Sequence, residues 1–243
     1  MAGKLFIVPT PVGNLGDMSP RAVDVLRSVS LILAEDTRTT GILLRHFDIS
    51  TPTQSHHKYN EHRPLDPILD RITAGENIAL VSDAGTPGIS DPGFLLSREC
   101  RRRGIEVETL PGPTAFVPAL VNSGLPCDRF FFEGFLPQKK GRATRLEFLA
   151  ELPCTFVIYE SPLRLARTLE NLAEVCGETR EAAVCREISK VYDTTHRDTL
   201  KNLIEYFSTN QARGEIVIVV SGKEKPDKER RHKNKYKDVE NGE

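Results

Sequence analysis

The sequence predicts an α/β fold in which a parallel five-stranded sheet, with helices on both faces, is followed by a mixed-sheet α/β domain. Short apolar runs alternate with helical patterns five times in about the first 120 residues, and such alternation produces a parallel sheet covered on both faces. The pattern changes near residues 124–128. Beyond that point strands follow one another without a helix between them, as at Val184 and Tyr192, which is typical of a mixed sheet.

Elements of the first half are marked by apolar runs and by residues that start helices. The runs that predict strands occupy residues 5–10, 31–34, 78–81 and 106–110. Ser19 and Pro20 suit the cap and first turn of a helix, and Asp91 with Pro92 suits the start of another over residues 94–103. A further helix is predicted by apolar residues spaced i, i+3, i+4 and i+7, namely Leu65, Ile68, Leu69 and Ile72.

The second half continues with its own strands and helices. Strands are expected at 130–135, 155–159, 182–186 and 215–221, and helices at 144–150, from Ser161-Pro162 onward and at 199–207. Just before the change of pattern, Thr114 is expected to cap a short helix. From Lys223 onward the residues are nearly all charged or polar. We therefore expect an N-terminal domain over 1–123, a C-terminal domain over 124–222 and a disordered charged tail over 223–243.

The composition is that of a soluble globular protein and argues against several classes. Of the 243 residues, 39% are hydrophobic and 28% charged, and the formal net charge of −1 argues against capture of naked nucleic acid by charge alone. The five cysteines form no C-x-x-C pair, so we expect reduced thiols in a cytoplasmic protein rather than a disulfide scaffold. No signal peptide and no apolar span of about 18 residues is found, so no membrane contact is expected.

The most informative stretch is the loop at residues 81–93, V-S-D-A-G-T-P-G-I-S-D-P-G. It is longer than a strand-to-helix connection needs, and its three glycines let a ligand approach the backbone closely. Residues 9–14, 35–39 and 111–114 also follow strands, so these loops are expected at one edge of the sheet, where ligands bind in open α/β folds. An ordinary loop rich in turn residues is the alternative reading of residues 81–93.

No common nucleotide-binding motif accompanies these loops. The first strand is not followed by G-x-G-x-x-G, and G-x-x-x-x-G-K-[ST] does not occur, so a nicotinamide dinucleotide and nucleoside triphosphate hydrolysis are not indicated. The glycine-rich run of the common Rossmann-like methyltransferases is also missing. What remains is an unusual pairing of P-T-P-V-G-N at residues 9–14 with D-A-G-T-P-G-I-S-D-P-G at residues 83–93.

These motifs resemble those of the 16S ribosomal RNA ribose 2′-O-methyltransferases that modify a cytidine of the decoding region, a family of the tetrapyrrole-methylase superfamily. The resemblance runs from about residue 4 to 224, its most specific part is the long central loop, and the tail lies outside it. The matching segments are V-P-T-P-V-G-N-L-G-D (8–17), A-E-D-T-R (34–38), N-E-H (60–62), V-S-D-A-G-T-P-G-I-S-D-P-G (81–93), L-P-G-P-T-A (110–115), F-E-G-F-L-P (132–137), Y-E-S-P-L-R-L (159–165), R-E-I-S-K (186–190) and R-G-E-I-V-I-V-V (213–220).

The resemblance implies two α/β domains, S-adenosylmethionine bound in the cleft between them, and a homodimer. Members of the superfamily hold this cofactor with residues after the fourth strand, at the turn after the fifth strand and at edges of the second domain. The positions that correspond here are Pro9, Asp83, Gly85, Thr86, Pro87, Ile89, Ser90, Thr114 and Ala115, together with Tyr159, Arg186 and Glu215.

The reaction that the resemblance implies is attack of a ribose 2′-oxygen on a sulfonium methyl group. No metal is required, because the sulfonium is already activated, but the enzyme must align the two centres and accept the hydroxyl proton. The candidate catalytic residues are Glu187 and Lys190 from R-E-I-S-K, with Asp36 and Arg38 from A-E-D-T-R. The alternatives are a solvated charge pair at a strand end for the first two and a local salt bridge for the second two.

Two segments are candidates for contact with RNA. Basic side chains of the segment K-K-G-R-A-T-R would bind phosphates without reading bases, and they are Lys139, Lys140, Arg142 and Arg145. A solvated helix start is the alternative for this segment. Asn14 ends a loop that is poorer in glycine than in the tetrapyrrole enzymes, which favours the RNA branch. The run R-R-R at residues 101–103 is expected only to complement the end of a helix.

Histidines gather at His56, His57 and His62, with Glu61 beside them. Zinc uses such ligands, but zinc motifs bring regular spacing and a second cluster, which are missing here. We therefore expect no metal, and interpret the segment as one that shapes an RNA pocket or as a plain polar loop.

Three functions remain open on this basis. The leading one is an S-adenosylmethionine-dependent methyltransferase that acts on 16S ribosomal RNA in the small ribosomal subunit. The others are a methyltransferase of the same fold acting on a corrin, porphyrin or modified protein residue, and a non-catalytic ribosome-binding protein. The basic segment favours the first over the second, and the intact central loop disfavours the third. A pI of 6.6 fits recognition of an assembled particle by shape better than a grip on loose RNA.

Overall fold

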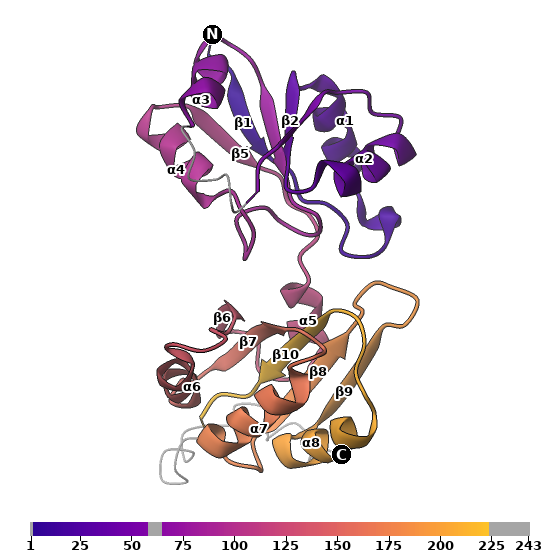
Figure 1. The fold of residues 1–243 in the computed structure, drawn as a ribbon, viewed down its shortest axis with the longest axis vertical. Coiled ribbons are helices and arrows are strands. Elements are labelled where there is room, and N and C mark those ends of the chain that lie inside the picture. Colours follow the sequence, from indigo (N-terminus) through magenta and orange to yellow (C-terminus); the bar gives the residue numbers. More distant parts are fainter. Residues whose placement is uncertain (1, 58–64, 224–243) are drawn as a thin grey trace, which may run out of the picture.

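The computed structural model describes residues 2–57 and 65–223, which form two five-stranded sheets. The first half of the chain builds the upper part of Figure 1 and the second half builds the lower part. Within these two ranges, none of the helices combines the length and the apolar character needed to cross a bilayer. The motif N-E-H, with His62 and Glu61, lies outside the described residues. Of the predicted tail over 223–243, only Lys223 is described, and its N–H donates to the Leu152 carbonyl at 2.7 Å.

The first sheet is parallel, as predicted, and has the strand order β3-β2-β4-β1-β5. Its strands are β1 (Lys4–Ile7), β2 (Leu31–Ala34), β3 (Thr53–Ser55), β4 (Ile78–Val81) and β5 (Glu106–Thr109). Helices α1 (Pro20–Ser28) and α2 (Thr37–His46) pack on one face, and α3 (Asp66–Thr73) and α4 (Phe94–Arg102) on the other (Figure 1). β2 and β4 are buried along their whole length, as parallel strands covered on both faces must be.

Of the helix starts predicted within residues 1–123, one follows the sequence rules and two depart from them. Ser19 caps α1 by accepting a hydrogen bond from the Ala22 N–H at 3.1 Å, as predicted. The predicted cap at Asp91, with Pro92 in the first turn, is wrong, because α4 begins at Phe94 after Gly93 as its cap residue. Asp91 instead bonds to Ser82 at the end of β4. Thr114 is not a cap either, since α5 (Phe116–Asn122) follows Ala115 without a side-chain cap.

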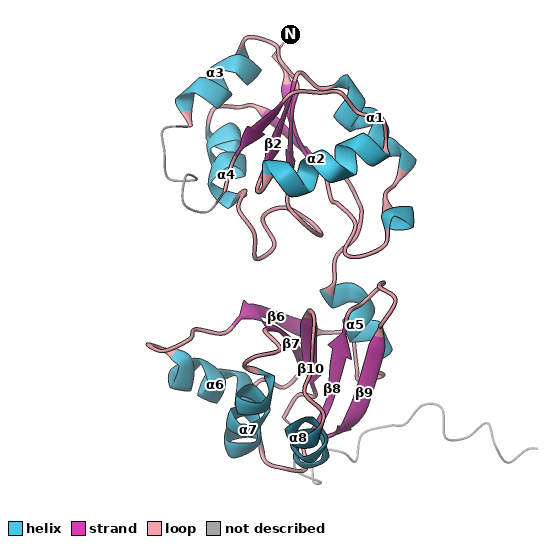
Figure 2. Cartoon of the chain, turned by 45° about the vertical axis from the view of Figure 1, so that its right-hand side comes forward, coloured by secondary structure: helices cyan, strands magenta, loops and turns pink. Residues whose placement is uncertain are grey.

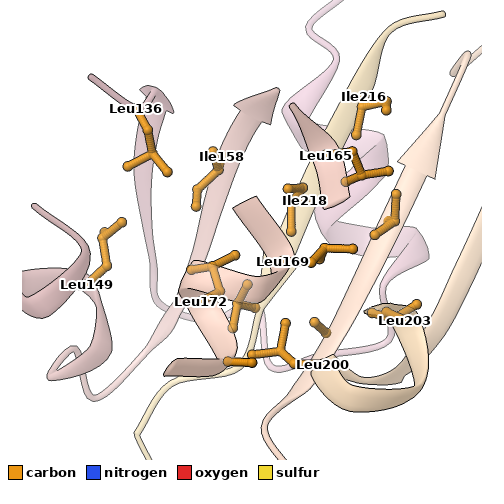
Figure 3. Packing of buried hydrophobic residues seen from close by; sticks show 14 of the residues in the cluster. Leu136, Leu149, Ile158, Leu165, Leu169, Leu172, Leu200, Leu203, Ile216 and Ile218 are labelled. Atoms are coloured by element: carbon orange, nitrogen blue, oxygen red, sulfur yellow. The ribbon is translucent and has the colours of Figure 1, made fainter. Parts of the chain in front are cut away.

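The second sheet is mixed, as predicted, with the order β6-β7-β10-β8-β9. Its strands are β6 (Phe130–Phe135), β7 (Thr155–Glu160), β8 (Glu181–Arg186), β9 (Thr194–Thr199) and β10 (Ile216–Val220). Only β6 and β7 are parallel; the other pairs are antiparallel. Helices α6 (Arg142–Ala150), α7 (Leu165–Cys176) and α8 (Leu200–Thr209) cover one face (Figure 2), and their leucines pack on the isoleucines of β7 and β10 (Figure 3).

Two features near the junction between the halves bear on the site. Helix α5 packs through Ala119 and Leu120 on the second sheet, on the face opposite α6, α7 and α8, although it precedes the predicted boundary. The domain boundary at residue 124 itself stays a prediction. Helix α7 begins at Leu165 and not at the predicted Ser161-Pro162, because the Glu160 carboxylate accepts hydrogen bonds from the Ser161 N–H and the Arg164 guanidinium and holds this segment in a turn.

Candidate functional site

A cavity of about 430 Å³ lies between the two halves of the chain. Nine of the predicted cofactor residues line it, and they are Asp83, Gly85, Thr86, Ile89, Ser90, Thr114, Ala115, Tyr159 and Glu215. They come from the loops after β4 and β5 and from the ends of β7 and β10. The structure therefore brings together segments that lie more than 100 residues apart in the sequence.

The loops on the first-half side are fixed to one another by hydrogen bonds. Thr10 and Gly85 exchange two backbone hydrogen bonds of 2.9 Å, and the Thr10 hydroxyl donates to the Ser82 carbonyl at 3.0 Å. The Thr86 hydroxyl donates to the Pro113 carbonyl at 3.1 Å. Gly85 has φ of 86°, a conformation that glycine adopts without strain. The loops after β1, β4 and β5 therefore form one connected wall.

Three predicted cofactor residues do not line the cavity. Pro9 packs beneath the turn after β5, since a Cβ atom added to Gly112 would lie 2.7 Å from the Pro9 Cβ. Pro87 is buried within the central loop. Arg186 donates to the Thr194 hydroxyl at 3.2 Å across β8 and β9. A direct role of these three residues in cofactor binding stays a prediction.

Three carboxylates that were not predicted as site residues line the cavity besides Asp83 and Glu215. They are Glu160, which accepts hydrogen bonds from Ser161 and Arg164, and the two residues Glu35 and Asp91. The pKa of Glu35 is raised mainly by burial and to a smaller extent by the nearby charge of Asp83. Burial also raises the pKa of Asp83. Burial and then Glu35 raise the pKa of Asp91 to about 7, although a hydrogen bond with Ser82 acts in the opposite direction. Among residues 2–57 and 65–223, no group of three potential ligand residues is arranged to hold a metal ion.

The sequence contained a signal for a site role of Glu35 and of Asp91. Glu35 is the first residue after β2, which is the position where ligand-facing side chains are expected in a parallel sheet. Asp91 precedes a helix, so its interpretation as a cap competed with a role in the site. Only the structure decides between a cap and a site residue, because it shows that α4 starts after Gly93 and not after Asp91.

The four predicted catalytic residues are not among the residues that line the cavity. They pair with one another, and Lys190 also pairs with the lining residue Glu215. Lys190 Nζ lies 3.0 Å from Glu187 Oε1 and 3.1 Å from Glu215 Oε2. The Glu215 N–H and then Lys190 lower the pKa of Glu187; burial lowers the pKa of Lys190, but its bonds to the two carboxylates outweigh burial and raise it. Arg38 binds Asp36 at 2.6 Å and lowers the pKa of Asp36 to about 2.

The basic segment divides into exposed and internally bound residues. Arg142 donates to the Thr168 hydroxyl and the Pro137 carbonyl, and burial lowers its pKa. Arg145 pairs with Glu133 at 2.6 Å and lies over the Phe148 ring. Lys139 and Lys140 are exposed and remain available to a partner.

The remaining polar candidates lie in loops. Asn14 is exposed and caps the short 3₁₀ helix η1 (Leu15–Asp17) by accepting from the Gly16 N–H at 2.9 Å. His56 is buried next to the end of β3. Whether either residue contacts a ligand stays a prediction.

Comparisons with known proteins agree with this architecture. The family model of the Tetrapyrrole (Corrin/Porphyrin) Methylases matches residues 4–204. "Ribosomal RNA small subunit methyltransferase I" of Synechocystis is 50% identical over 90% of this chain and 79% of its own length, and the protein of that name from Escherichia coli O157:H7 is 47% identical over 90% and 78%. A solved structure of a cobalt precorrin-4 methyltransferase covers 90% of this chain and 94% of its own at 18% identity, with a TM-score of 0.65. With its motifs, its two sheets and these relatives, the chain belongs to the tetrapyrrole methylases and, among them, to the ribosomal RNA small subunit methyltransferase I family.

Proposed function

We propose that this protein uses S-adenosylmethionine to methylate the ribose 2′-OH of a cytidine in 16S ribosomal RNA, acting as a homodimer on the small ribosomal subunit in the cytoplasm. The observation that carries the proposal is the cavity in which the loops after β1, β2, β4 and β5 meet the second half of the chain. The relatives, which are named for methylation of small-subunit ribosomal RNA, support the choice of substrate.

The residues around the cavity fit this cofactor. Its volume of about 430 Å³ is in the range of small-molecule sites. Apolar side chains such as Val12, Ile89 and Ile216 suit the faces of an adenine ring, and the carboxylates of Glu35, Asp83 and Asp91 suit a ligand with positively charged groups. S-adenosylmethionine, when bound, supplies a methyl group on a positively charged sulfur.

The ribose oxygen that gains the methyl group must lose its proton, and this chain has to provide an acceptor. A carboxylate whose pKa lies near the working pH is suited to this role, and Asp91 lines the cavity with a pKa of about 7. Lys190 stays charged, while Glu187 and Asp36 are weakened as bases by their partners. We therefore assign proton acceptance to Asp91, and a positioning role to the pairs Glu187–Lys190 and Asp36–Arg38.

Calorimetric titration with S-adenosylhomocysteine tests the cofactor site. The wild type is expected to bind, and Thr86→Arg is expected to lose binding because the larger side chain fills the cavity. Thr209→Arg, at the exposed end of α8, is the matched control and should bind as the wild type does. Equal affinity of Thr86→Arg and the wild type would place the cofactor elsewhere.

Methyl transfer from labelled cofactor tests the substrate. Small ribosomal subunits that lack the modification are expected to accept the label, and protein-free 16S RNA and corrin precursors are expected to accept far less. Transfer to a corrin precursor alone would favour the tetrapyrrole alternative. Cofactor binding of any kind would exclude a purely non-catalytic ribosome-binding protein. Sedimentation of the purified chain at several concentrations tests the homodimer.

A further inference from the structure

Helix α4 presents an exposed face that combines an aromatic ring with three arginines. The face consists of Phe94, Ser97, Arg98, Arg101 and Arg102, which line a surface depression. Their spacing of i, i+3, i+4, i+7 and i+8 places them along one side of a helix. Leu96 and Cys100 point the other way and are fully buried in the core beside the first sheet. The aromatic-basic face is therefore not needed for packing of α4.

Phe94 is unusually placed for a large apolar side chain. It is 63% exposed, and the guanidinium carbon of Arg98 lies 5.4 Å from the centre of its ring. An exposed ring beside a guanidinium group is the combination on which proteins stack unpaired RNA bases. A base on this ring would shield apolar surface that now faces water.

The charge of the face is complementary to RNA. Arg98 and Arg102 share one carboxylate, that of Glu99, at 3.2 and 3.1 Å, and Arg101 makes no ion pair within the described part of the chain. Three guanidinium groups against one carboxylate leave an excess of positive charge. Arg103 does not contribute, since it binds Asp66 and Asp70. Within the run R-R-R, Arg103 is thus engaged by the two aspartates of α3, while Arg101 and Arg102 belong to the exposed face.

The face begins at the edge of the cavity. Asp91 lines the cavity, and Phe94 starts α4 three residues later. Only Pro92 and Gly93 separate the two residues, and the Gly88 N–H donates a hydrogen bond of 3.1 Å to the Pro92 carbonyl, which fixes the end of the central loop just before α4. In Figure 1, α4 lies on the outer side of the first sheet, next to the loops that descend toward the second half. A base stacked on Phe94 would therefore lie close in the chain to Asp91, which lines the cavity.

We propose that the exposed face of α4 binds small-subunit RNA, with an unpaired base stacked on Phe94 and backbone phosphates bound by Arg98, Arg101 and Arg102. The inference rests on the proposed function and adds a substrate surface to it. It also adds cationic groups for RNA to those of residues 139–145, where Arg142 and Arg145 are already bound to other residues of the protein.

Steady-state methylation of unmodified small ribosomal subunits tests this surface with three variants of the full chain. They are Phe94→Ala, Phe94→Leu and the double variant Arg101→Ala/Arg102→Ala. Loss of one stacked base is expected to raise the KM for subunits about ten-fold, and loss of two phosphate contacts to raise it and to reduce its dependence on salt. The affinity for S-adenosylhomocysteine and the Tm should stay as in the wild type. Phe94→Leu keeps an apolar side chain without a ring, so it separates stacking from general burial.

Lys201→Ala removes an exposed charge from α8, at the far end of the second half, and should leave the KM unchanged. Unchanged KM values in all three α4 variants, with an active wild type, would overturn this inference alone. A change in self-association instead of KM would also overturn it, since the face would then join two copies of the chain. A wild type that transfers no methyl group to subunits would overturn the proposed function and this inference together.

Discussion

The Ser189 hydroxyl donates a hydrogen bond of 2.6 Å to Asp17 Oδ2, although the two residues are 172 positions apart. Asp17 ends η1 in the loop after β1, and Ser189 lies between β8 and β9. Ser189 and Glu187 have φ values of 66° and 54°, which non-glycine residues adopt only when other contacts hold them. The bond to Asp17 and the Lys190–Glu187 pair provide such contacts. Ile188, which lines the cavity, is thereby fixed against the first half.

Gly13→Ala is expected to disturb this junction. A Cβ atom at residue 13 would lie 2.3 Å from the Lys190 Cγ and 3.2 Å from the Ile188 carbonyl oxygen, so residues 188–190 would have to move. Overpacking of this kind costs about 1–3 kcal/mol. Because Ile188 lines the cavity, we expect S-adenosylhomocysteine to bind about ten-fold more weakly in calorimetry, which corresponds to about 1.4 kcal/mol.

The matched control is Gly41→Ala in the middle of α2, where the nearest atom to the new Cβ is an Arg45 nitrogen at 3.6 Å. This change should stabilise the protein by about 0.5–1 kcal/mol and leave cofactor affinity unchanged. If Gly13→Ala bound the ligand as tightly as Gly41→Ala does, the junction would have no influence on the cavity.

Leu172→Ala is expected to lower the free energy of unfolding by about 2–5 kcal/mol, because it removes a fully buried side chain from the core under α7 (Figure 3). Leu163→Ala removes the same atoms from a side chain that is 87% exposed and should change stability by less than about 0.5 kcal/mol. Urea denaturation of both variants gives the comparison. Equal losses would contradict the packing described here.

The sequence was sufficient for much of the fold because its strongest signals are local. The buried runs of β2 and β4 are apolar throughout, and Ser19-Pro20 marks a helix start that needs no tertiary contact. By contrast, β3 is a three-residue edge strand, T-Q-S, with every residue exposed, and it has no apolar pattern. Its existence depends on pairing with β2, which only the folded chain provides.

The candidate site was predictable where topology alone places residues together. Loops at the carboxyl ends of parallel strands must meet, so Gly85, Thr86 and Thr114 were expected side by side. The partner that each charged side chain binds could not be predicted from the sequence. Arg145 was expected to bind RNA phosphates, yet it donates a hydrogen bond to Glu133, twelve residues earlier in the sequence. Glu133 is in β6 and Arg145 in α6, so the contact depends on how this helix packs beside the strand.

Asp91→Asn is expected to change the pH dependence of stability. The pKa of Asp91 is raised from 3.8 to about 7, so the native state holds this proton more tightly than the unfolded chain does. In the wild type, the contribution of Asp91 to stability is therefore lost as the pH rises from about 4 to about 7. Asparagine cannot titrate. The Tm of the variant relative to the wild type should increase over this range and level off above pH 7, and a constant difference would contradict the raised pKa.

The same substitution tests the role of Asp91 in the reaction. An acceptor must be ionised, so single-turnover methyl transfer by the wild type is expected to rise with pH up to about 7 and then to level off. Asp91→Asn should lower this rate by about 10²–10⁴-fold and remove the rise near pH 7. Glu35→Gln is the control, because it removes the neighbouring charge that raises the pKa of Asp91 and should shift the rise to lower pH without abolishing the rate. A variant at residue 91 that keeps both the rate and the pH profile would assign the proton to another group.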